Sequence, residues 1–434
     1  MTVTFDPAHP EYLDQLDVRG ELTRIFDVCQ GCRRCVGSCG LFPTLFDLLD
    51  GHEVPDAGRL TPADQDQVVD ACVQCRLCVA ECPYAPGRHE LSIDVPRTMV
   101  RAAAMRRSAG LLPWRTRAAA QLLGRTDLIG RLATTTGFAN AFVTAEPRSV
   151  RRRVLALFTG VSATRRLSPF ARQRFSTWMA NWTAKRPAAP AARRRGRVTV
   201  FPSCLVEYQA TSVGTDLVQV YERNGVECGV TAARCCGAPW LHAGDVERFG
   251  RLARRNVAVL AAEVRAGTDI VVPEPACLAV IRNDYPDHVG GDDARLVADH
   301  TFDAAAYLAR LHEEVPLDAD FPGDTPRHVT YHLSNDLRAL GVGVPGRTLL
   351  ELTGARVTTV DQRGAIGGLW SLRAANDAAS LPLVEQPGEP TDAAADDVVA
   401  GDGHLVNTLI AEQTTRRSSH PLQILARAYG IAER

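Results

Sequence analysis

The sequence predicts an α+β protein of several domains, in which a helical cysteine-rich domain and a basic helical connector precede two tandem α/β lobes. Three observations support this fold class. Eight of the thirteen cysteines fall between residues 29 and 82, in two runs separated by a helical apolar pattern. Residues 101–196 are strongly basic, with apolar residues at helical spacing. From Arg197 onward, short β-branched runs alternate with helical patterns, as in α/β layer architectures.

Composition limits the class of protein and its compartment. The chain has 434 residues, of which 45% are hydrophobic, and a net charge of −1. No stretch reaches the about 18 consecutive apolar residues of a membrane-spanning helix, and the acidic start, MTVTFDPAHPEYLDQL, lacks the apolar core of an export signal. We therefore expect a cytoplasmic protein. Because cytoplasmic thiols stay reduced, thirteen cysteines indicate metal ligation and not a disulfide framework.

Residues 1–100 contain two cysteine runs with the spacing C-x2-C-x2-C-x3-C. This spacing is typical of two-cluster ferredoxins, in which the fourth cysteine of each run ligates the cluster of the other run. Closely spaced thiolates wrap three corners of a cluster, and a more distant sulfur takes the fourth corner. Zinc, the alternative, needs only four ligands, usually in separated C-x2-C pairs. We predict two 4Fe-4S clusters, one bound by Cys29, Cys32, Cys35 and Cys82, the other by Cys72, Cys75, Cys78 and Cys39.

The segment between the two runs favours a helical ferredoxin domain. Gly40 stands where a proline usually follows the fourth cysteine, which should not abolish ligation. In FPTLFDLLD, the apolar residues fit one face of a helix. We therefore predict an α-helical two-cluster ferredoxin domain over the compact β-rich kind.

The connector, residues 101–196, contains nineteen Arg and one Lys against Asp127 and Glu146, a net charge of 20 − 2 = +18. Three uses are open: docking an acidic redox partner, peripheral contact with the inner face of a membrane, and binding nucleic acid. Nucleic acid is disfavoured because aromatic residues are sparsely interleaved. The structural alternative is a solvated face of basic helices, whose positive charge is balanced by the acidic residues in the rest of the chain.

Residues 197–325 are predicted as an α/β lobe and carry the other five cysteines. An adjacent Cys-Cys-Gly element lies between FPSC and PEPAC. Adjacent cysteines point in different directions and can ligate different iron atoms, and the glycine permits close approach of the backbone. Buried structural cysteines are the alternative, and we assign that role to Cys228. The predicted ligands of a third cluster are Cys204, Cys235, Cys236 and Cys277.

This CCG element, with its flanking FPSC and PEPAC, resembles the cysteine-rich domain of heterodisulfide reductases. Behind a two-cluster ferredoxin domain, the same element is found in glycolate oxidase iron-sulfur subunits and in the C subunit of anaerobic glycerol-3-phosphate dehydrogenase. The stretches CRRCVGSCGLFPTLFDLLD, CCGAPWLHAGD and HTFDAAAYL are most similar to a rubrerythrin-associated branch of the glycerol-3-phosphate dehydrogenase family. The resemblance implies a CCG-type, non-cubane 4Fe-4S cluster. The C-x-x-C that is common downstream in these relatives is here reduced to Cys277 alone.

Residues 326–434 are predicted as a second, degenerate CCG-type lobe, because RHVTYHLSN opens as RVTVFPSC does. Where the family pattern has YHxxCH, this chain has Asn335 at the cysteine position, and a later cysteine-glycine element reads Arg363-Gly364. No cysteine follows Cys277. The number of ligands therefore excludes a cluster in this lobe. We expect it to serve as a scaffold, a dimerising surface or a partner platform.

Together the motifs predict an iron-sulfur electron-transfer subunit of an oxidoreductase, which relays electrons between two cubanes, the CCG-type cluster and a partner redox protein. No dinucleotide fingerprint or hydrolase motif is present, and no catalytic residue is assigned. The resemblance implies a partner that is either rubrerythrin-like or a flavin dehydrogenase oxidising glycerol 3-phosphate or a 2-hydroxy acid. Two alternatives stay open: catalytic thiol-disulfide chemistry at the CCG cluster, as in heterodisulfide reductases, and a non-catalytic iron-sulfur sensor or scaffold.

Overall fold

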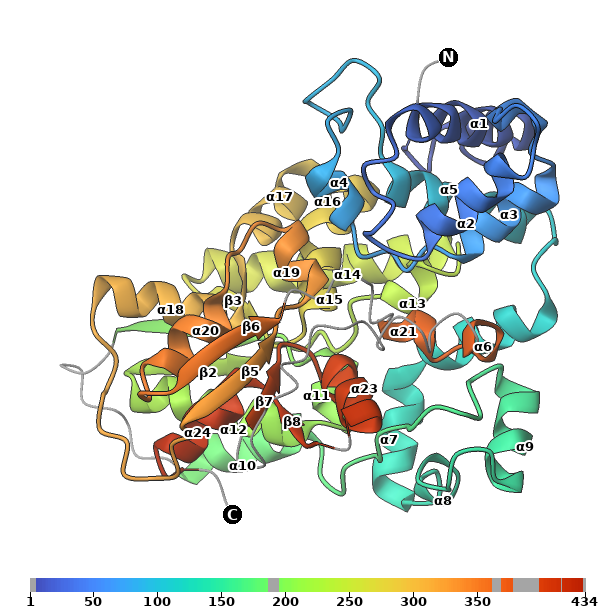
Figure 1. Cartoon of the computed structure of the whole chain (residues 1–434). Helices are drawn as coiled ribbons and strands as arrows, with labels where there is room; N and C mark the ends of the chain where they lie inside the picture. The colour runs from blue at the N-terminus through green and yellow to red at the C-terminus, as the bar shows by residue number, and fades with distance from the viewer. Residues whose placement is uncertain (1–4, 186–194, 361–367, 378–397, 415, 432–434) are drawn as a thin grey trace.

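The structure, a computed structural model, describes residues 5–185, 195–360, 368–377, 398–414 and 416–431. Its N-terminal part is helical, and its C-terminal half contains two parallel four-stranded sheets (Figure 1). These features confirm the predicted mixture of a helical cysteine-rich part with α/β lobes. Residues 186–194 of the connector and the Arg363-Gly364 element lie outside the described residues.

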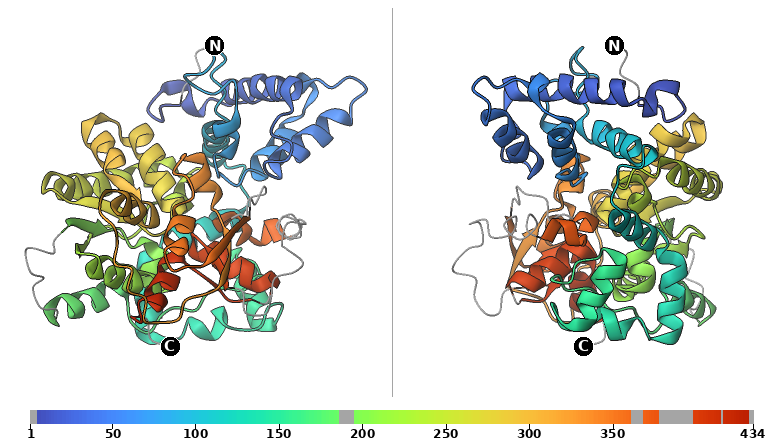
Figure 2. Two further views of the ribbon diagram at one scale, coloured as in Figure 1. Left: turned by 60° about the vertical axis from the view of Figure 1, so that its left-hand side comes forward. Right: turned by 90° about the vertical axis from the view of Figure 1, so that its right-hand side faces the viewer.

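The N-terminal helices gather at one end of the molecule (Figure 2). Asp14 caps the first long helix by accepting a hydrogen bond from the backbone N–H of Asp17, and Thr61 and Asp64 form a capping box on a later helix. The segment FPTLFDLLD is helical, and its apolar face is buried against the first long helix, as the sequence predicted. The elements are η1 Pro10–Leu13, α1 Gln15–Cys32, α2 Leu41–Asp50, η2 Ala57–Arg59, α3 Pro62–Asp70, α4 Leu77–Glu81 and α5 Val95–Ser108.

Helix α5 runs through the boundary that we placed between residues 100 and 101. Arg101 is only 1% exposed, and its guanidinium pairs with Asp17 at the start of α1. Arg106 pairs with Asp70 at 2.7 Å. These two cations therefore hold α5 to the other N-terminal helices and are not part of a free basic surface.

The connector is helical (Figure 1). It packs against the first lobe at two glycines. A Cβ at Gly124 would lie 2.2 Å from the ring of Trp240, and a Cβ at Gly130 would lie 2.4 Å from the ring of Tyr208. Only glycine permits these close approaches. No helix among the described residues is both long and apolar enough to cross a membrane. The helices are α6 Trp114–Gly124, α7 Thr126–Thr136, α8 Asn140–Val143, α9 Val150–Thr159 and α10 Phe175–Lys185.

The two sheets share one topology, with strand orders β2-β1-β3-β4 and β6-β5-β7-β8 and parallel pairing throughout. In each sheet the first strand of the chain lies inside, its successor pairs on one side, and the third strand pairs on the other. The similar openings RVTVFPSC and RHVTYHLSN thus supply equivalent strands. The strands are β1 Gly196–Val200, β2 Val226–Val230, β3 Asp269–Val272, β4 Thr301–Asp303, β5 His328–His332, β6 Arg356–Val360, β7 Val398–Gly401 and β8 Ser418–Ser419.

The two lobes share a hydrophobic core. Helix α24 of the second lobe packs against α12 of the first, and α20 packs against α18. The first lobe contains α11 Ser203–Tyr208, α12 Thr211–Arg223, α13 Ala238–Leu241, α14 Val246–Arg265, α15 Pro275–Ala279, a π-helix Val280–Asp284, α16 Tyr285–Val289, α17 Gly291–Asp299 and α18 Ala304–Glu314. The second lobe contains α19 Asn335–Ala339, α20 Pro345–Glu351, α21 Gly368–Ser371, η5 Ala374–Asn376, α23 His404–Thr414 and α24 Pro421–Ala428.

Candidate iron-sulfur site

The two N-terminal cysteine runs have matching backbone turns. In each run, the residue after the second cysteine is left-handed: Arg33 has a φ of 48° and Arg76 a φ of 59°. This conformation is uncommon for residues other than glycine and turns the chain sharply. The turn ends helix α1 in the first run and precedes α4 in the second. It lets the third cysteine of each run return toward the first two.

The electrostatic neighbours of the eight thiols fall into two groups. Burial, to which Cys35 and Cys82 add, raises the pKa of Cys29 to about 12. Burial, together with Cys39, raises the pKa of Cys72 to about 12. The fourth cysteine of each run therefore lies beside the other run. This proximity supports the crossed ligand sets, which stay a prediction.

Backbone N–H groups point at several of these sulfurs. The N–H groups of Gln74, Leu77 and Tyr84 each donate to the cysteine two residues earlier, and each lowers the pKa of that thiol. The N–H groups of Leu41 and Phe42 do the same for Cys39. Hydrogen bonds to the sulfurs are one of the means by which a protein sets the potential of an iron-sulfur cluster.

The donor set fits an iron-sulfur cluster. Several buried thiols that raise one another's pKa form an unfavourable group unless a cation stabilises the thiolates, and thiolate is the form that ligates metal. Within the described part of the chain, no three ligand-type side chains are grouped closely enough for a metal ion. A cluster separates its thiolates by its own iron atoms, so its ligands lie further apart than those of a lone ion. Cysteine motifs of this kind indicate iron-sulfur clusters.

The second cysteine group lies beyond the carboxyl ends of three neighbouring strands of the first sheet. Cys204 is on α11 after β1, the Cys-Cys pair is in the loop after β2, and Cys277 is on α15 after β3. Ligand sites in parallel α/β sheets are formed at this edge. Gly237 has a φ of 91° and approaches the ring of Phe249, so a Cβ there would lie 2.8 Å from it. The loop therefore needs its glycine.

The four thiols of this group make two close contacts. The Sγ atoms of Cys277 and Cys236 are 3.0 Å apart, and the Cys204 and Cys235 side chains are hydrogen-bonded. These hydrogen bonds, followed by burial, raise the pKa of Cys204 and Cys277, while the bond from Cys204 lowers the pKa of Cys235. The structure thus brings together the four residues that the sequence singled out. Cys228 lies apart from them on β2, in the apolar core.

A buried hydrogen-bond network fixes the Cys-Cys loop. Asn256 on α14 donates to the backbone carbonyl of Cys235 and to the hydroxyl of Tyr285, both at 2.8 Å. The Tyr285 hydroxyl donates in turn to the carbonyl of Cys236 at 3.1 Å. Tyr285 follows a π-helical turn, a feature that often marks functional sites. The network contacts the backbone carbonyls of Cys235 and Cys236. It therefore positions both residues without using a hydrogen bond to either sulfur atom.

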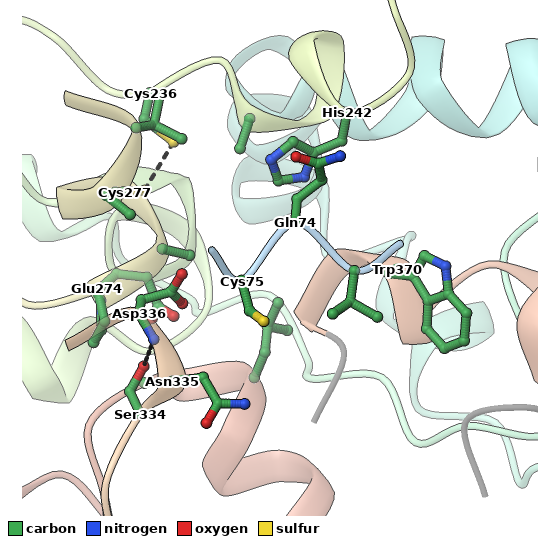
Figure 3. Close-up of a pocket in the computed structure, with 18 of the residues that line it drawn as sticks. Gln74, Cys75, Cys236, His242, Glu274, Cys277, Ser334, Asn335, Asp336 and Trp370 are labelled. Atoms are coloured by element: carbon green, nitrogen blue, oxygen red, sulfur yellow. Dashed lines mark hydrogen bonds between the residues drawn. The ribbon is translucent and has the colours of Figure 1, made fainter. Parts of the chain in front are cut away.

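A cavity of ≈ 120 Å³, which we call the cluster cavity, connects the two cysteine regions. The four CCG cysteines line it, and so does Cys75 of the second ferredoxin run. Figure 3 shows Cys236, Cys277 and Cys75 around this cavity. The second lobe closes one side with Ser334, Asn335 and Asp336. Asn335, at the position where the family pattern has a cysteine, therefore faces the first lobe's cysteines across one cavity.

Acidic residues around the cluster cavity were not identified from the sequence. Burial raises the pKa of Glu274 to about 8, that of Asp336 to about 7 and that of Asp284 to about 6. The Glu274 carboxylate accepts a hydrogen bond from the backbone N–H of His404 at 3.0 Å. Burial lowers the pKa of His242, another lining residue, to about 3, so this imidazole is neutral. The PEPAC and YHLSND motifs contain Glu274 and Asp336 and could have indicated them, whereas Asp284 lies in none of these motifs.

An ion pair and a hydrogen bond fix the ferredoxin domain on the two lobes. Arg76, next to Cys75, pairs with Asp284 at the end of the π-helix, and both side chains are largely buried. The indole N–H of Trp370, in the second lobe, donates to the backbone carbonyl of Asp70 at 2.8 Å. These contacts maintain the alignment of Cys75 with the CCG cysteines.

Comparison with known proteins agrees with this arrangement. Residues 22–109 match the Citrate utilization protein B Fer4-like domain, and residues 198–282 match the family described as Cysteine-rich domain. The chain is similar to the C subunit of anaerobic glycerol-3-phosphate dehydrogenase from Escherichia coli (strain K12), with 26% identity over 318 residues, 71% of this chain and 76% of that protein. It is also similar to lactate utilization protein A of Bacillus thuringiensis (strain Al Hakam) and of Bacillus cereus (strain B4264). Each is 30% identical over 188 residues, 41% of this chain and 75% of the relative.

Proposed function

Because the chain belongs to the family of lactate utilization protein A, we propose that it is the iron-sulfur electron-transfer subunit of a dehydrogenase complex. The names of the relatives specify glycerol 3-phosphate and lactate. We therefore propose a flavin dehydrogenase of a small hydroxylated acid or phosphate ester as the partner. A rubrerythrin-like partner, which the sequence resemblance implies, is the second choice.

One observation supports this function above the others: Cys75 and the four CCG cysteines line a single cavity. Clusters bound there would take up and release single electrons. The chain's own residues hold the two ligand groups facing each other. The buried contact of Arg76 with Asp284 keeps this spacing fixed. Electron exchange between two clusters requires that the protein hold them at a short, fixed separation.

Iron and sulfide analysis with paramagnetic resonance, on protein purified without oxygen, tests the proposal. We expect about twelve iron atoms per chain, from three clusters of four. Copurification should identify the dehydrogenase, and its substrate should reduce the clusters rapidly. A count of about eight iron atoms per chain would show that the CCG cluster is not part of the relay. Zinc in place of iron would refute the proposal as a whole.

The cluster cavity favours a second candidate function, reduction of a disulfide at the CCG cysteines. Ser334, Asn335 and Asp336 form the cavity wall opposite those cysteines, and a small group could reach the cluster from that side. Cleavage of a disulfide into two thiols takes two electrons, here from the clusters, and two protons, here from solvent. If this candidate is right, small disulfides should reoxidise the reduced, isolated protein. A reduced state that disulfides leave unchanged would exclude it.

A further inference from the structure

The predicted cluster ligands form a series that runs from the interior of the protein to its surface. Cys75 lines the cluster cavity together with the four CCG cysteines. The four thiols assigned to the second run's cluster, Cys75 and Cys78 among them, line one narrow cavity of their own. Burial raises the pKa of Cys78, and neighbouring thiols that include Cys35 of the other ligand set add to this effect. The second run's cluster site therefore lies between the CCG cysteines and the first run's cluster site.

Two loops, residues 33–37 and 83–92, bring the first run's ligand set to the surface. We call them the first-cluster face. The first loop contains the third ligand of that run, and the second loop follows Cys82 directly. Val36 is 52% exposed. Residues 86–90 are all exposed, and their loop projects from the molecule above α4 (Figure 1). The first-cluster face is thus the end of the ligand series that another protein can approach.

The projecting loop of this face is held by its own contacts. The Arg88 guanidinium donates to the backbone carbonyl of Cys82 at 3.1 Å. The rings of Tyr84 and His89 meet edge to face, with centroids 5.0 Å apart, and the Tyr84 carbonyl accepts from the N–H of Ile93 at 2.7 Å. These contacts fix the loop beside a predicted cluster ligand although its tip is exposed. A preformed loop can bind a partner without a large entropic cost of ordering.

The charge and size of the first-cluster face fit an electron-transfer contact. Its two loops contain Arg33, Arg34 and Arg88 against Glu90, a net charge of 3 − 1 = +2, around the exposed Val36. Electron-transfer interfaces are small, below about 1,200 Å² in total, and charges at their rim guide the encounter of the two proteins. The face therefore fits a partner that presents a small apolar patch with carboxylates at its rim.

We propose that the partner flavin dehydrogenase docks on the first-cluster face and that its electrons enter the chain there. The inference rests on the proposed function, which supplies the partner. The reduced flavin loses one electron at a time, the first run's cluster gains it, and the protons of the flavin go to solvent. The electron then passes to the second run's cluster and to the CCG cluster. The basic connector, the other candidate for docking a redox partner, lies outside this face.

Stopped-flow reduction of the full, cluster-containing chain by reduced flavodoxin tests the proposal. Flavodoxin is an acidic flavoprotein with an exposed flavin edge and serves as the surrogate partner. V36E places a carboxylate in the middle of the face, so we expect it to lower the second-order rate constant at least about tenfold. Val54 is 59% exposed on the same domain but lies outside the face, so V54E is the matched control and should react as the unsubstituted chain does. Iron content and reduction by dithionite should be the same in all three proteins.

P86E is a second variant, because it places the same charge on the exposed loop tip, away from every predicted ligand, and should also slow the reaction. Equal rate constants in V36E, P86E and V54E, or no reaction of the unsubstituted chain, would overturn the proposal. Dissolved dysprosium-EDTA should speed the magnetic relaxation of the cluster that C39S retains in the ferredoxin domain more than that of the others. An effect confined to the other clusters would contradict the proposal.

Failure of the docking face is distinguishable from failure of the proposed function. A chain without iron-sulfur clusters would refute the electron-transfer function itself. A fully loaded chain whose clusters the dehydrogenase reduces equally fast in V36E, P86E and V54E would refute the docking face alone.

Discussion

Replacing Arg76 by methionine tests whether the ion pair with Asp284 holds the ferredoxin domain on the first lobe. The side chains are 15% and 7% exposed, and they come from positions 208 residues apart in the sequence. Removal of one partner from a buried pair leaves an uncompensated charge and destabilises by about 3–5 kcal/mol. Methionine replaces the aliphatic stem of the arginine without its charge, and the left-handed φ of 59° is equally unfavourable for both residues. The expected loss therefore reflects the charge.

The loss should depend on pH. Burial raises the pKa of Asp284 to about 6, above the unfolded value of about 3.9, and Arg76 opposes this shift. Because the folded state binds this proton more tightly, stability falls as pH rises through the folded pKa. In R76M that pKa moves further up. The variant's extra instability should be complete at about pH 8.5 and should shrink toward pH 6, by about 1.4 kcal/mol for each unit of the additional shift.

Urea unfolding of the cluster-containing protein, with hydrogen exchange at α4 and α16, provides the measurement. Arg33 is the matched control, because it follows the second cysteine of the first run and has the same left-handed turn. Its pair with Asp50 is exposed, with side chains 39% and 48% accessible, so R33M should change stability little. The double variant R76M/D284N should recover most of the loss. Equal effects of R33M and R76M, or an R76M effect that is independent of pH, would refute the reasoning.

Three further predictions concern the ligand sets and the connector. C39S should abolish the cluster assigned to the second run, not the one nearest in sequence; loss of only the other resonance signal would exclude crossed ligation. Arg152 is fully buried and donates to three backbone carbonyls, so R152M should destabilise the connector by about 3 kcal/mol or more, measured by limited proteolysis against the exposed-site control R151M. G130A would bring a Cβ to 2.4 Å from the Tyr208 ring and should cost about 1–3 kcal/mol in urea unfolding; unchanged stability would contradict that close packing.

The parts of the site that the sequence predicted are local. Cysteine spacing over a few residues reveals ligand runs because the chain between ligands is too short to separate them, and the helix α2 followed from its apolar pattern. The equivalence of the two lobes was readable from similar strand openings. In each case neighbours in the sequence determine neighbours in space.

The parts that sequence reasoning missed depend on contacts between distant segments. Nothing near Arg76 in the sequence indicates Asp284, and burial of Glu274 and Asp336 depends on how two lobes and the ferredoxin domain meet. The basic connector shows the same difficulty. The net charge of the connector included Arg101, but the Arg101 side chain is buried and paired with Asp17 in the N-terminal helices. Net charge over a segment does not distinguish a solvated cation from one inside a domain.

Packing between the lobes explains why the second lobe persists although its ligand cysteines are missing. Helix α24 packs against α12, and Leu422 and Leu425 are buried in the same core as Leu217 and Tyr221 of the first lobe. Ligand residues and packing residues are thus different sets, so loss of the ligands leaves the shared core intact. A chain that ends at residue 325 would keep all twelve predicted ligands but would expose this apolar face to water. We expect it to aggregate on expression, whereas N335A in the full chain, a substitution at the cavity wall, should stay folded by circular dichroism. A monodisperse 1–325 fragment with full iron content would show that the first lobe does not need its partner.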